Sequence, residues 1–483
     1  MAVVEINTRK ERPLGLLEKY QLSKQLTQAY GNITLTAELE HPNLYNEQQN
    51  IEEVYQLAFA PALTRLIETH PNLSLTVRDK TESTAHLAQL DTINLSDNVQ
   101  LTNITSLQEL IAEQTDAEFD IDSLLPLWRI KIMPQTSTSC IVVFTIHHIV
   151  ADGMSLCIFW NGFLQGLNVK QQEQQQFDAN GKNKENEKLI IHVKESVITL
   201  PYEESGAPSL SLAWDVVPVL CHSLIPKFLP TALARYVDPI SYVGWKGDFA
   251  AIEGEAHNTD VRLISVPLDI WKPIMIEAKR QGISVHAILF MSMMLAWTRL
   301  YPDQTTTEVS TPINCRGLCN PPVPNNQIGN FVGAYTSIWT GKQLQQDIWL
   351  LAKKYNDDLN KNKIDGAKQP LFLKYLPEFP ASYCDFWYDK RKSSTLGRAG
   401  GIELSDLGRF SYNQDVWKVK QMYFCQSAQT FTNAFTMNSI TTNDALFCTI
   451  SWQIGSLDVV KMDKFHDTFI GILKNIPLKE LIN

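Results

Sequence analysis

The apolar pattern of the chain is clearest at residues 140–146 (CIVVFTI), which contain no charge and no break. Seven consecutive apolar or β-branched residues predict a buried strand. The apolar residues of 154–164 predict a helix, and the turn between them, 147–153 (HHIVADG), is polar. A turn that joins a buried strand to a helix is a position where polar side chains can face a cleft.

Strands and helices mix along the rest of the chain. We expect helices at residues 51–70, 269–280 and 284–300. We expect strands at residues 73–77, 261–266, 309–313, 334–339, 402–404, 418–426, 432–439 and 445–452, the last two resembling a hairpin. Residues 170–188 are polar and of low complexity, so we expect a flexible surface loop there.

A length of 483 residues predicts two large domains. We expect a first lobe over residues 1–200, an apolar and proline-rich connecting segment over 201–258, and a second lobe over 259–483. Within the connecting segment, residues 210–237 are strongly apolar but contain four charged or titratable residues and three prolines. This content disfavours a membrane-spanning helix. It leaves attachment to a membrane surface or, as we expect, a buried or substrate-covering segment.

Composition excludes several classes of protein. The formal net charge is -10 and no basic stripe is visible, so we expect no nucleic-acid partner. Eight cysteines are too sparse for a disulfide scaffold, and the spacing of Cys315 and Cys319 fits neither a zinc nor a redox motif. His70 and His286 have no metal-ligand partners at useful spacing, so we expect no metal. The charged N-terminal residues are unlike a signal peptide, which predicts a cytoplasmic protein with free thiols.

The turn HHIVADG is the strongest chemical signal in the sequence. A neutral imidazole can accept a proton from a nucleophile near pH 7, and adjacent histidines point in different directions. Asp152 is better placed to bind an arginine and fix the turn than to orient a histidine. Gly153 is expected to give the backbone freedom to enter the helix. The alternative is that two histidines merely satisfy hydrogen bonds at a domain surface.

The pattern His147-His148-x-x-x-Asp152-Gly153 resembles the signature of the chloramphenicol acetyltransferase-like superfamily. That superfamily includes nonribosomal peptide condensation domains, plant-type acyltransferases and fungal alcohol O-acetyltransferases. Further segments, spread over nearly the whole chain, look most similar to the fungal branch: RPLG at 12–15 with Glu18, PLWR at 126–129, WKG at 245–247, IGNFV at 328–332 and LSDLG at 404–408. The DFGWG segment of plant-type enzymes is absent, and Asp406 stands where the family usually has Asn.

The resemblance implies an α/β fold of two similar lobes, each a mixed sheet with flanking helices, around a central channel. It implies that His148 acts as general base on the acceptor, which attacks the thioester directly, without a covalent acyl-enzyme. His147 and Gly153 support the site. Asp152 is structural and pairs with an arginine, for which Arg129 is our first candidate and Arg316 the second. A donor to the tetrahedral intermediate would come from Ser405 or Asn330.

We therefore expect a CoA-dependent acyltransferase that moves acetyl from acetyl-CoA to the hydroxyl of a lipophilic alcohol or secondary metabolite. One alternative is transfer to an amine, such as a sphingoid base; another is a non-catalytic binding protein that retains the fold. Acetyl-CoA would be a co-substrate, with no bound cofactor, and the chain is expected to be a monomer. The apolar residues 210–237 allow contact with a lipid surface such as the endoplasmic reticulum or a lipid droplet.

Overall fold

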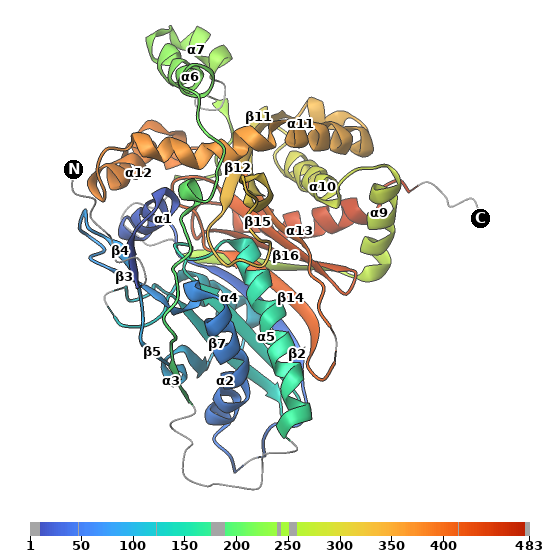
Figure 1. Ribbon diagram of the computed structural model, residues 1–483. Helices are drawn as coiled ribbons and strands as arrows, with labels where there is room; N and C mark the ends of the chain where they lie inside the picture. The colour runs from blue at the N-terminus through green and yellow to red at the C-terminus, as the bar shows by residue number, and fades with distance from the viewer. Residues whose placement is uncertain are drawn as a thin grey trace, which may run out of the picture.

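Two mixed β-sheets, one in each lobe, organise the fold (Figure 1). The structure, a computed structural model, describes residues 10–46, 48–121, 123–174, 189–238, 243–250, 258–413 and 415–478. Two small sheets flank the first lobe, one with the order β1(Glu11–Pro13)-β4(His86–Gln89)-β3(Leu75–Arg78) and one pairing β5(Thr92–Asn94) with β9(Ile190–His192). The α/β class and the two-lobe architecture expected from the sequence are confirmed.

The sheet of the first lobe has five strands in the order β14(Lys418–Gln426)-β2(Ile33–Glu40)-β8(Ser139–Ile146)-β7(Trp128–Thr136)-β6(Val99–Leu101). Strand β8 lies at its centre and is buried along nearly its whole length, as its uninterrupted apolar sequence predicts. Helices α2(Ile51–Thr69) and α5(Gly153–Gln174) pack against each other beside this sheet (Figure 1). Their close approach needs glycine, because a Cβ at Gly166 would lie 2.7 Å from the Cβ of Ala62. The shorter helices are α1(Leu16–Leu26), α3(Leu95–Asn98) and α4(Leu107–Asp116).

The sheet of the second lobe has six strands in the order β10(Thr259–Val266)-β16(Ala445–Gln453)-β15(Phe435–Thr442)-β13(Ile402–Arg409)-β11(Thr306–Asn314)-β12(Val332–Thr340). Its parallel pairs are β11 with β13 and β13 with β15. The helices of this lobe are α9(Leu268–Arg280), α10(Val285–Leu300), α11(Ile348–Lys368), α12(Ala381–Ser393) and α13(Val459–Lys474). Helix α10 is the most deeply buried of them and carries much of the second core.

Strand β14 connects the lobes. It lies within residues 259–483, the range assigned from sequence to the second lobe, yet it pairs antiparallel with β2 of the first lobe, with Met422 opposite Ala37. Met422 and Phe424 are buried in the core of the first lobe. The lobe boundaries drawn from sequence stay a prediction, but the sheet of the first lobe is complete only with this strand from the second.

Most expected elements are confirmed within a few residues. The strand predicted at 418–426 matches β14 in full, and the predicted hairpin is formed by β15 and β16. Residues 73–77 differ, because a 3-10 turn at Pro71–Ser74 precedes the short strand β3. The predicted loop 170–188 begins too early, since α5 continues through Gln174, and its remainder, 175–188, lies outside the described residues.

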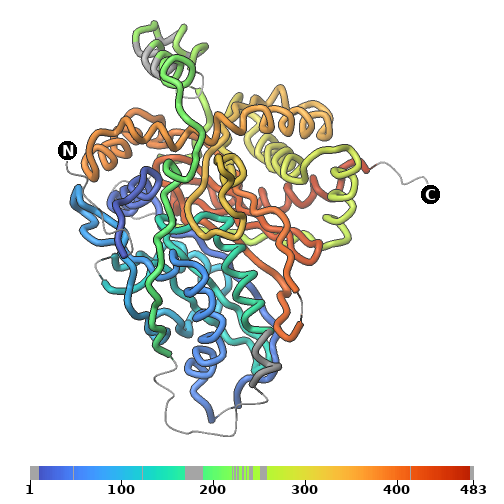
Figure 2. Tube along the Cα trace, in the orientation of Figure 1, coloured from blue at the N-terminus to red at the C-terminus, as the bar shows by residue number. Residues whose placement is uncertain are grey.

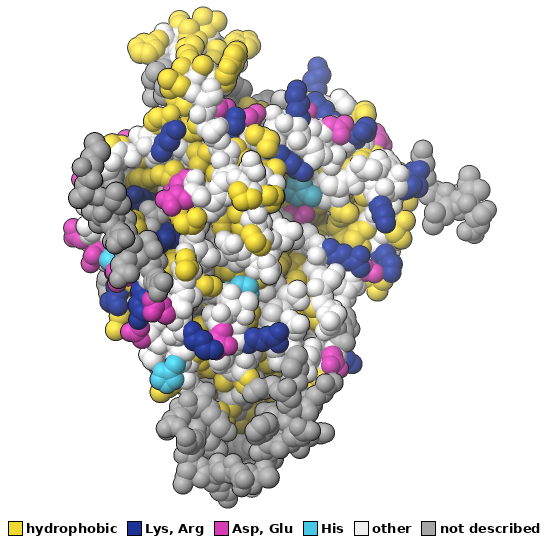
Figure 3. Space-filling model, in the orientation of Figure 1, with side chains coloured by type: hydrophobic (Ala, Val, Ile, Leu, Met, Phe, Trp, Pro, Cys, Tyr) yellow, Lys and Arg dark blue, Asp and Glu magenta, His cyan; other side chains and the backbone are white. Residues whose placement is uncertain are grey.

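The apolar segment 210–237 projects from the second lobe as a short π-helical turn, Leu212–Val216, followed by α6(Val217–Phe228) and α7(Thr231–Val237) (Figures 1 and 2). Apolar side chains gather over this projection (Figure 3). Trp214, Phe228 and Tyr236 are 84%, 85% and 87% exposed. The expectation of a buried segment is therefore wrong for these side chains, because, among the described residues, α6 and α7 pack mainly against each other and against the turn Leu212–Val216.

Among the described residues, no single helix is long and apolar enough to cross a membrane. Helices α9 and α10 together have the length and apolar composition of a membrane span, but the pair is bent by 119°. The eight cysteines are free thiols, and Cys315 and Cys319 are buried, as expected.

Candidate active site

The turn between β8 and α5 is shaped by a cap at the start of the helix. The Asp152 Oδ1 atom accepts a hydrogen bond from the Ser155 backbone N–H at 2.9 Å, and the Ser155 hydroxyl accepts one from the Asp152 N–H at 3.3 Å. Such a reciprocal pair satisfies donors that the first helical turn leaves free. Gly153 has no positive φ, so the expected need for backbone freedom is wrong. A Cβ at this position would lie 2.7 Å from the Leu407 Cδ2 atom, so a larger residue would have to displace the Leu407 side chain.

His148 lies at a cavity of about 680 Å³ lined by both lobes. The first lobe contributes Tyr30 and Lys24, and the second contributes Ser310 and Ser405. A volume of this size is in the range of small-molecule sites in proteins. The cavity lies between the two lobes, where the resemblance to acyltransferases implied a channel.

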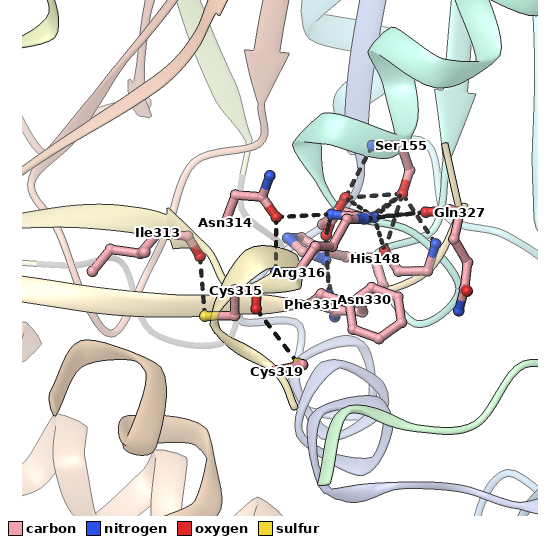
Figure 4. Close-up of polar contacts among 12 residues, drawn as sticks. His148, Ser155, Ile313, Asn314, Cys315, Arg316, Cys319, Gln327, Asn330 and Phe331 are labelled. Atoms are coloured by element: carbon pink, nitrogen blue, oxygen red, sulfur yellow. Dashed lines mark hydrogen bonds and ion pairs between the residues drawn. The ribbon is translucent and has the colours of Figure 1, made fainter. Parts of the chain in front are cut away.

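Asn330, from the second lobe, orients the His148 ring. Its side-chain N–H donates to the His148 carbonyl at 2.8 Å and lies 3.3 Å from Nδ1 (Figure 4). The nearby backbone carbonyls of His148 and Ala151 act to raise the pKa of the ring, against the effect of burial. The Nε2 atom makes no hydrogen bond to any described residue, so it is the nitrogen left to receive a proton from a ligand.

The surroundings of His148 keep its ring neutral. Burial and the positive charge of Lys24 lower the pKa of His148 to about 4, against the opposing effect of Asp152. The side chain is 9% exposed and lines the cavity. A neutral imidazole at physiological pH has a lone pair available, as a general base requires.

His147 has a structural role. Its Nε2 bonds to the Gln25 Oε1 atom at 2.6 Å, and its Nδ1 accepts from the Ile149 N–H at 3.0 Å. Burial, with the neighbouring His148 and Arg129, lowers the pKa of His147 to about 3. Both ring nitrogens form hydrogen bonds within the protein, so His147 stabilises the turn and has no ring nitrogen available to a ligand in the cavity.

Asp152 pairs with Arg316, the second of the two candidates from sequence. The guanidinium contacts the carboxylate with two nitrogens, at 2.7 Å to Oδ2 and 3.0 Å to Oδ1 (Figure 4). Arg316 is fully buried and also donates to the carbonyls of Gln327 and Gly329. The Phe331 N–H donates to Oδ2 at 3.0 Å. Although burial opposes it, the Arg316 charge holds the pKa of Asp152 below its usual value.

Arg129 does not reach Asp152, which corrects our first candidate. It extends from β7 to the end of α4, where it donates to Gln114 and to the Ala117 carbonyl at 2.6 Å. Its guanidinium also lies over the Phe119 ring, 4.4 Å from the centroid. Two arginines were compatible with the sequence because the pairing depends on how the lobes meet.

The two candidate oxyanion donors occupy different positions. The amide of Asn330 is committed to the His148 carbonyl, which makes it a positioning residue. Ser405, on β13, lines the cavity, and its hydroxyl has no hydrogen-bond partner among the described residues. Asp406, adjacent in sequence, is bound instead by the Ser439 hydroxyl at 2.8 Å and by His286 at 3.1 Å. Ser405 therefore has the free donor, and Asp406 has none to give.

Sequence reasoning missed two charged residues that line the same cavity, Lys24 and Glu403. Lys24 is on α1 and Glu403 on β13, and both are buried. Neither belongs to a recognisable motif, and only the folded structure brings them near His148. Within the described part of the chain, no group of three or more metal-binding side chains is found.

Two mixed-sheet lobes that meet at a cavity, with an HHxxxDG turn at its wall, define a chloramphenicol acetyltransferase-like or condensation-domain-like protein. The model of the alcohol acetyltransferase family matches residues 105–476, and that of the condensation domain matches residues 26–180. The chain therefore belongs to the alcohol acetyltransferase family and is an acyltransferase. No curated protein sequence matches it.

Solved structures with the same fold span the whole chain. TRI3 trichothecene 15-O-acetyltransferase from Fusarium sporotrichioides is 12% identical, with a TM-score of 0.68 over 98% of this chain and 96% of that one. The polyketide synthase associated protein 5 from Mycobacterium tuberculosis is 13% identical, with a TM-score of 0.59 over 96% and 98%. The epimerization domain of tyrocidine synthetase B is 13% identical, with a TM-score of 0.57 over 97% of each chain. These likenesses show the fold.

The buried ion pair leads to a stability prediction. Arg316→Met leaves the Asp152 carboxylate buried without its cation, and we expect the free energy of unfolding to fall by about 3–5 kcal/mol. Chemical denaturation followed by circular dichroism measures this loss. The matched control is Arg409→Met, which removes the exposed partner of Asp444 and should change stability little. Equal denaturation midpoints for the two variants would contradict the role of Arg316.

Proposed function

We propose that this acyltransferase moves acetyl from acetyl-CoA to the hydroxyl of a lipophilic alcohol, with His148 as general base. The observation that carries this proposal is a neutral, cavity-lining imidazole whose Nε2 has no partner among the described residues. The ordering of its ring by Asn330 directs that nitrogen to a bound acceptor. Membership of the alcohol acetyltransferase family supports a hydroxyl acceptor and an acetyl donor.

The proposed reaction is a direct displacement. The acceptor O–H gives its proton to His148 Nε2 while its oxygen forms a bond to the thioester carbonyl carbon. The C–S bond then breaks, and its electron pair leaves with sulfur. The imidazolium returns its proton to that thiolate, so that the products are the ester and free CoA. A base contributes about 10²–10⁴-fold to such a reaction.

Ser405 is our candidate donor to the oxygen that becomes negative during attack. Its hydroxyl lines the same cavity as His148 and is uncommitted. A donor of this kind commonly contributes about 2.7–4 kcal/mol to transition-state stabilisation. His147, Asp152 and Gly153 hold the turn in place without taking part in proton transfer.

The first test is transfer by the purified protein with acetyl-CoA and a panel of alcohols, sterols, polyols and sphingoid bases. Wild-type protein should release CoA thiol and form an ester. We expect His148→Ala to lower the rate by about 10²–10⁴-fold, because the acceptor loses its base. Product mass and thiol release are measured together, and circular dichroism verifies that the variant is folded.

His147→Gln serves as a matched control, because it changes the neighbouring imidazole and should retain far more activity than His148→Ala. Unchanged transfer by His148→Ala would contradict the assigned base. Product only on the amino group of the sphingoid bases would replace the hydroxyl acceptor with an amine. No transfer with any acceptor would contradict the proposal for this set of compounds.

The low pKa of His148 predicts the shape of the pH profile. A base is active when deprotonated, so kcat/KM should stay constant as pH falls from about 7 to about 5 and be half lost near the pKa of about 4. A pH–rate series with a stability check at each pH measures this. Lys24→Met removes a positive neighbour and should move the acid limb to higher pH. An acid limb near pH 6.5 in the wild-type protein, the value of an unperturbed imidazole, would contradict the analysis.

A further inference from the structure

Lys24 carries a buried positive charge to which no side chain or carbonyl of the described residues offers a hydrogen-bond acceptor. Its Nζ atom lies among three aromatic rings, 4.9 Å from the centroid of Tyr20, 4.7 Å from Tyr30 and 5.3 Å from Trp387. The residue is only 7% exposed. No described residue accepts a hydrogen bond from this ammonium group, and the side chain lines the cavity that holds His148. An ammonium group has three donors, and burial makes unused donors costly.

Glu403 supplies a carboxylate at the same cavity. Within the described part of the chain, its oxygens accept hydrogen bonds from three side-chain amides, those of Gln426 at 3.2 Å, Asn433 at 3.0 Å and Gln429 at 3.4 Å. No ion pair joins Glu403 to Lys24, although each charge affects the other: Glu403 opposes the burial that lowers the pKa of Lys24 to about 8. The two charges therefore face the cavity without neutralising each other by contact.

The site lies next to the base. The Tyr30 ring, which lies under the Lys24 ammonium group, has its centroid 6.1 Å from that of the His148 ring. The Tyr30 hydroxyl donates to the Gln426 side chain at 2.9 Å, and Gln426 in turn binds Glu403. The Tyr30 and Gln426 side chains thus connect the surroundings of His148 with Glu403, and Lys24 lies over the same Tyr30 ring.

We propose that Lys24 and Glu403 bind a second hydroxyl group of the acceptor, in addition to the one that is acetylated. This inference rests on the proposed function and narrows its acceptors to molecules with two or more hydroxyl groups. A hydroxyl is both acceptor and donor, so it accepts from the Lys24 ammonium and donates to the Glu403 carboxylate. The carboxylate disfavours a phosphate at this position, and the ammonium disfavours an amine.

The test compares two probes of the same chain length, dodecanol with one hydroxyl and dodecylglycerol with two free hydroxyls. Isothermal titration without acetyl-CoA measures binding independently of turnover. Wild-type protein should bind dodecylglycerol about ten to a hundred times more tightly than dodecanol, the range of a charge-assisted hydrogen bond. Lys24→Met should remove this preference, and the same-helix control Lys19→Met should retain it. The double variant Lys24→Met with Glu403→Gln, which removes both charges, applies if Lys24→Met alone does not fold.

Equal binding of the two probes by wild-type protein, or no binding of either, would overturn the inference even if acetyl transfer to other alcohols is found. An unchanged preference in Lys24→Met would also overturn it. Weaker binding of acetyl-CoA by Lys24→Met, with the preference intact, would assign the ammonium to the donor and would again contradict the proposal. Failure of transfer in the earlier panel would instead contradict the proposed function.

A second observation concerns the projecting helices α6 and α7. Residues 216–237 contain two basic residues and no Asp or Glu, although the whole chain has a net charge of -10. Many apolar side chains of residues 212–237 are exposed: Leu212, Trp214, Val217, Val219, Ile225, Phe228, Leu233, Tyr236 and Val237. Large exposed apolar patches mark interaction surfaces, and an apolar sequence with basic residues and no carboxylate suits an anionic lipid surface.

The base of this projection is attached to the wall of the cavity. Asp215, just before α6, bonds to Lys368 at 2.8 Å. Lys368 ends α11, and its sequence neighbours Gly366 and Gln369 line the cavity. We infer that residues 212–237 dock on an anionic phospholipid membrane, where amphiphilic acceptors collect at the entrance to the site.

Sedimentation with phosphatidylcholine vesicles that contain phosphatidylserine tests this docking. Wild-type protein should bind, and the triple variant W214S/F228S/Y236S should bind at least tenfold more weakly. The matched control replaces three exposed apolar residues elsewhere, L124S/V197S/V460S, and should bind as the wild type does. Thermal melting verifies that both variants fold. Absent binding, or equal binding by the two triple variants, would overturn the inference. Concentration-dependent dimers that W214S/F228S/Y236S abolishes, without vesicle binding, would replace the membrane with a second copy of the chain.

Discussion

The buried ion pair between Asp152 and Arg316 holds the two lobes in register around the cavity. Both carboxylate oxygens of Asp152 accept hydrogen bonds. Oδ1 accepts from Arg316 and from the Ser155 N–H, and Oδ2 accepts from Arg316 and from the Phe331 N–H. Arg316 also binds the Gly329 carbonyl, so the ion pair fixes both neighbours of Asn330. Asn330 in turn orients His148. His148 of the first lobe is therefore positioned by the second lobe, and the candidate site is formed where the two lobes meet.

The charges around the cavity separate two tasks. Burial and Lys24 keep the His148 ring neutral and ready to accept a proton. Lys24 and Glu403 line the same cavity without an ion pair between them, so the Lys24 ammonium group has hydrogen-bond donors available for a ligand. A buried charge without a direct partner is costly to a folded protein, and such groups concentrate where a ligand completes them. Lys24 and Glu403 therefore form a charged region of the cavity wall, whose other lining residues are both polar and apolar.

Most elements and the turn that carries His148 could be predicted from the sequence, because strong apolar runs and the HHxxxDG pattern are local. The sequence could not choose between Arg129 and Arg316, since one lies on a strand and the other follows one, and only the contact between the lobes decides which reaches Asp152. Strand β14 was predicted within its exact bounds but not its partner, because β2 lies almost 400 residues away. The network of Lys24 and Glu403 left no local pattern. The exposure of Trp214, Phe228 and Tyr236 was also not predicted, since apolar composition is ordinarily a sign of burial.

Mass spectrometry of the intact protein tests direct attack most directly. The protein is incubated with acetyl-CoA alone, quenched within a few turnover times and weighed, and a second sample receives an accepted alcohol before quenching. Direct displacement with His148 as base predicts unmodified protein in both samples and ester only in the second. A stoichiometric acetyl group on the protein in the first sample, lost when the alcohol is added, would contradict the account, because it would make an acyl-enzyme the intermediate.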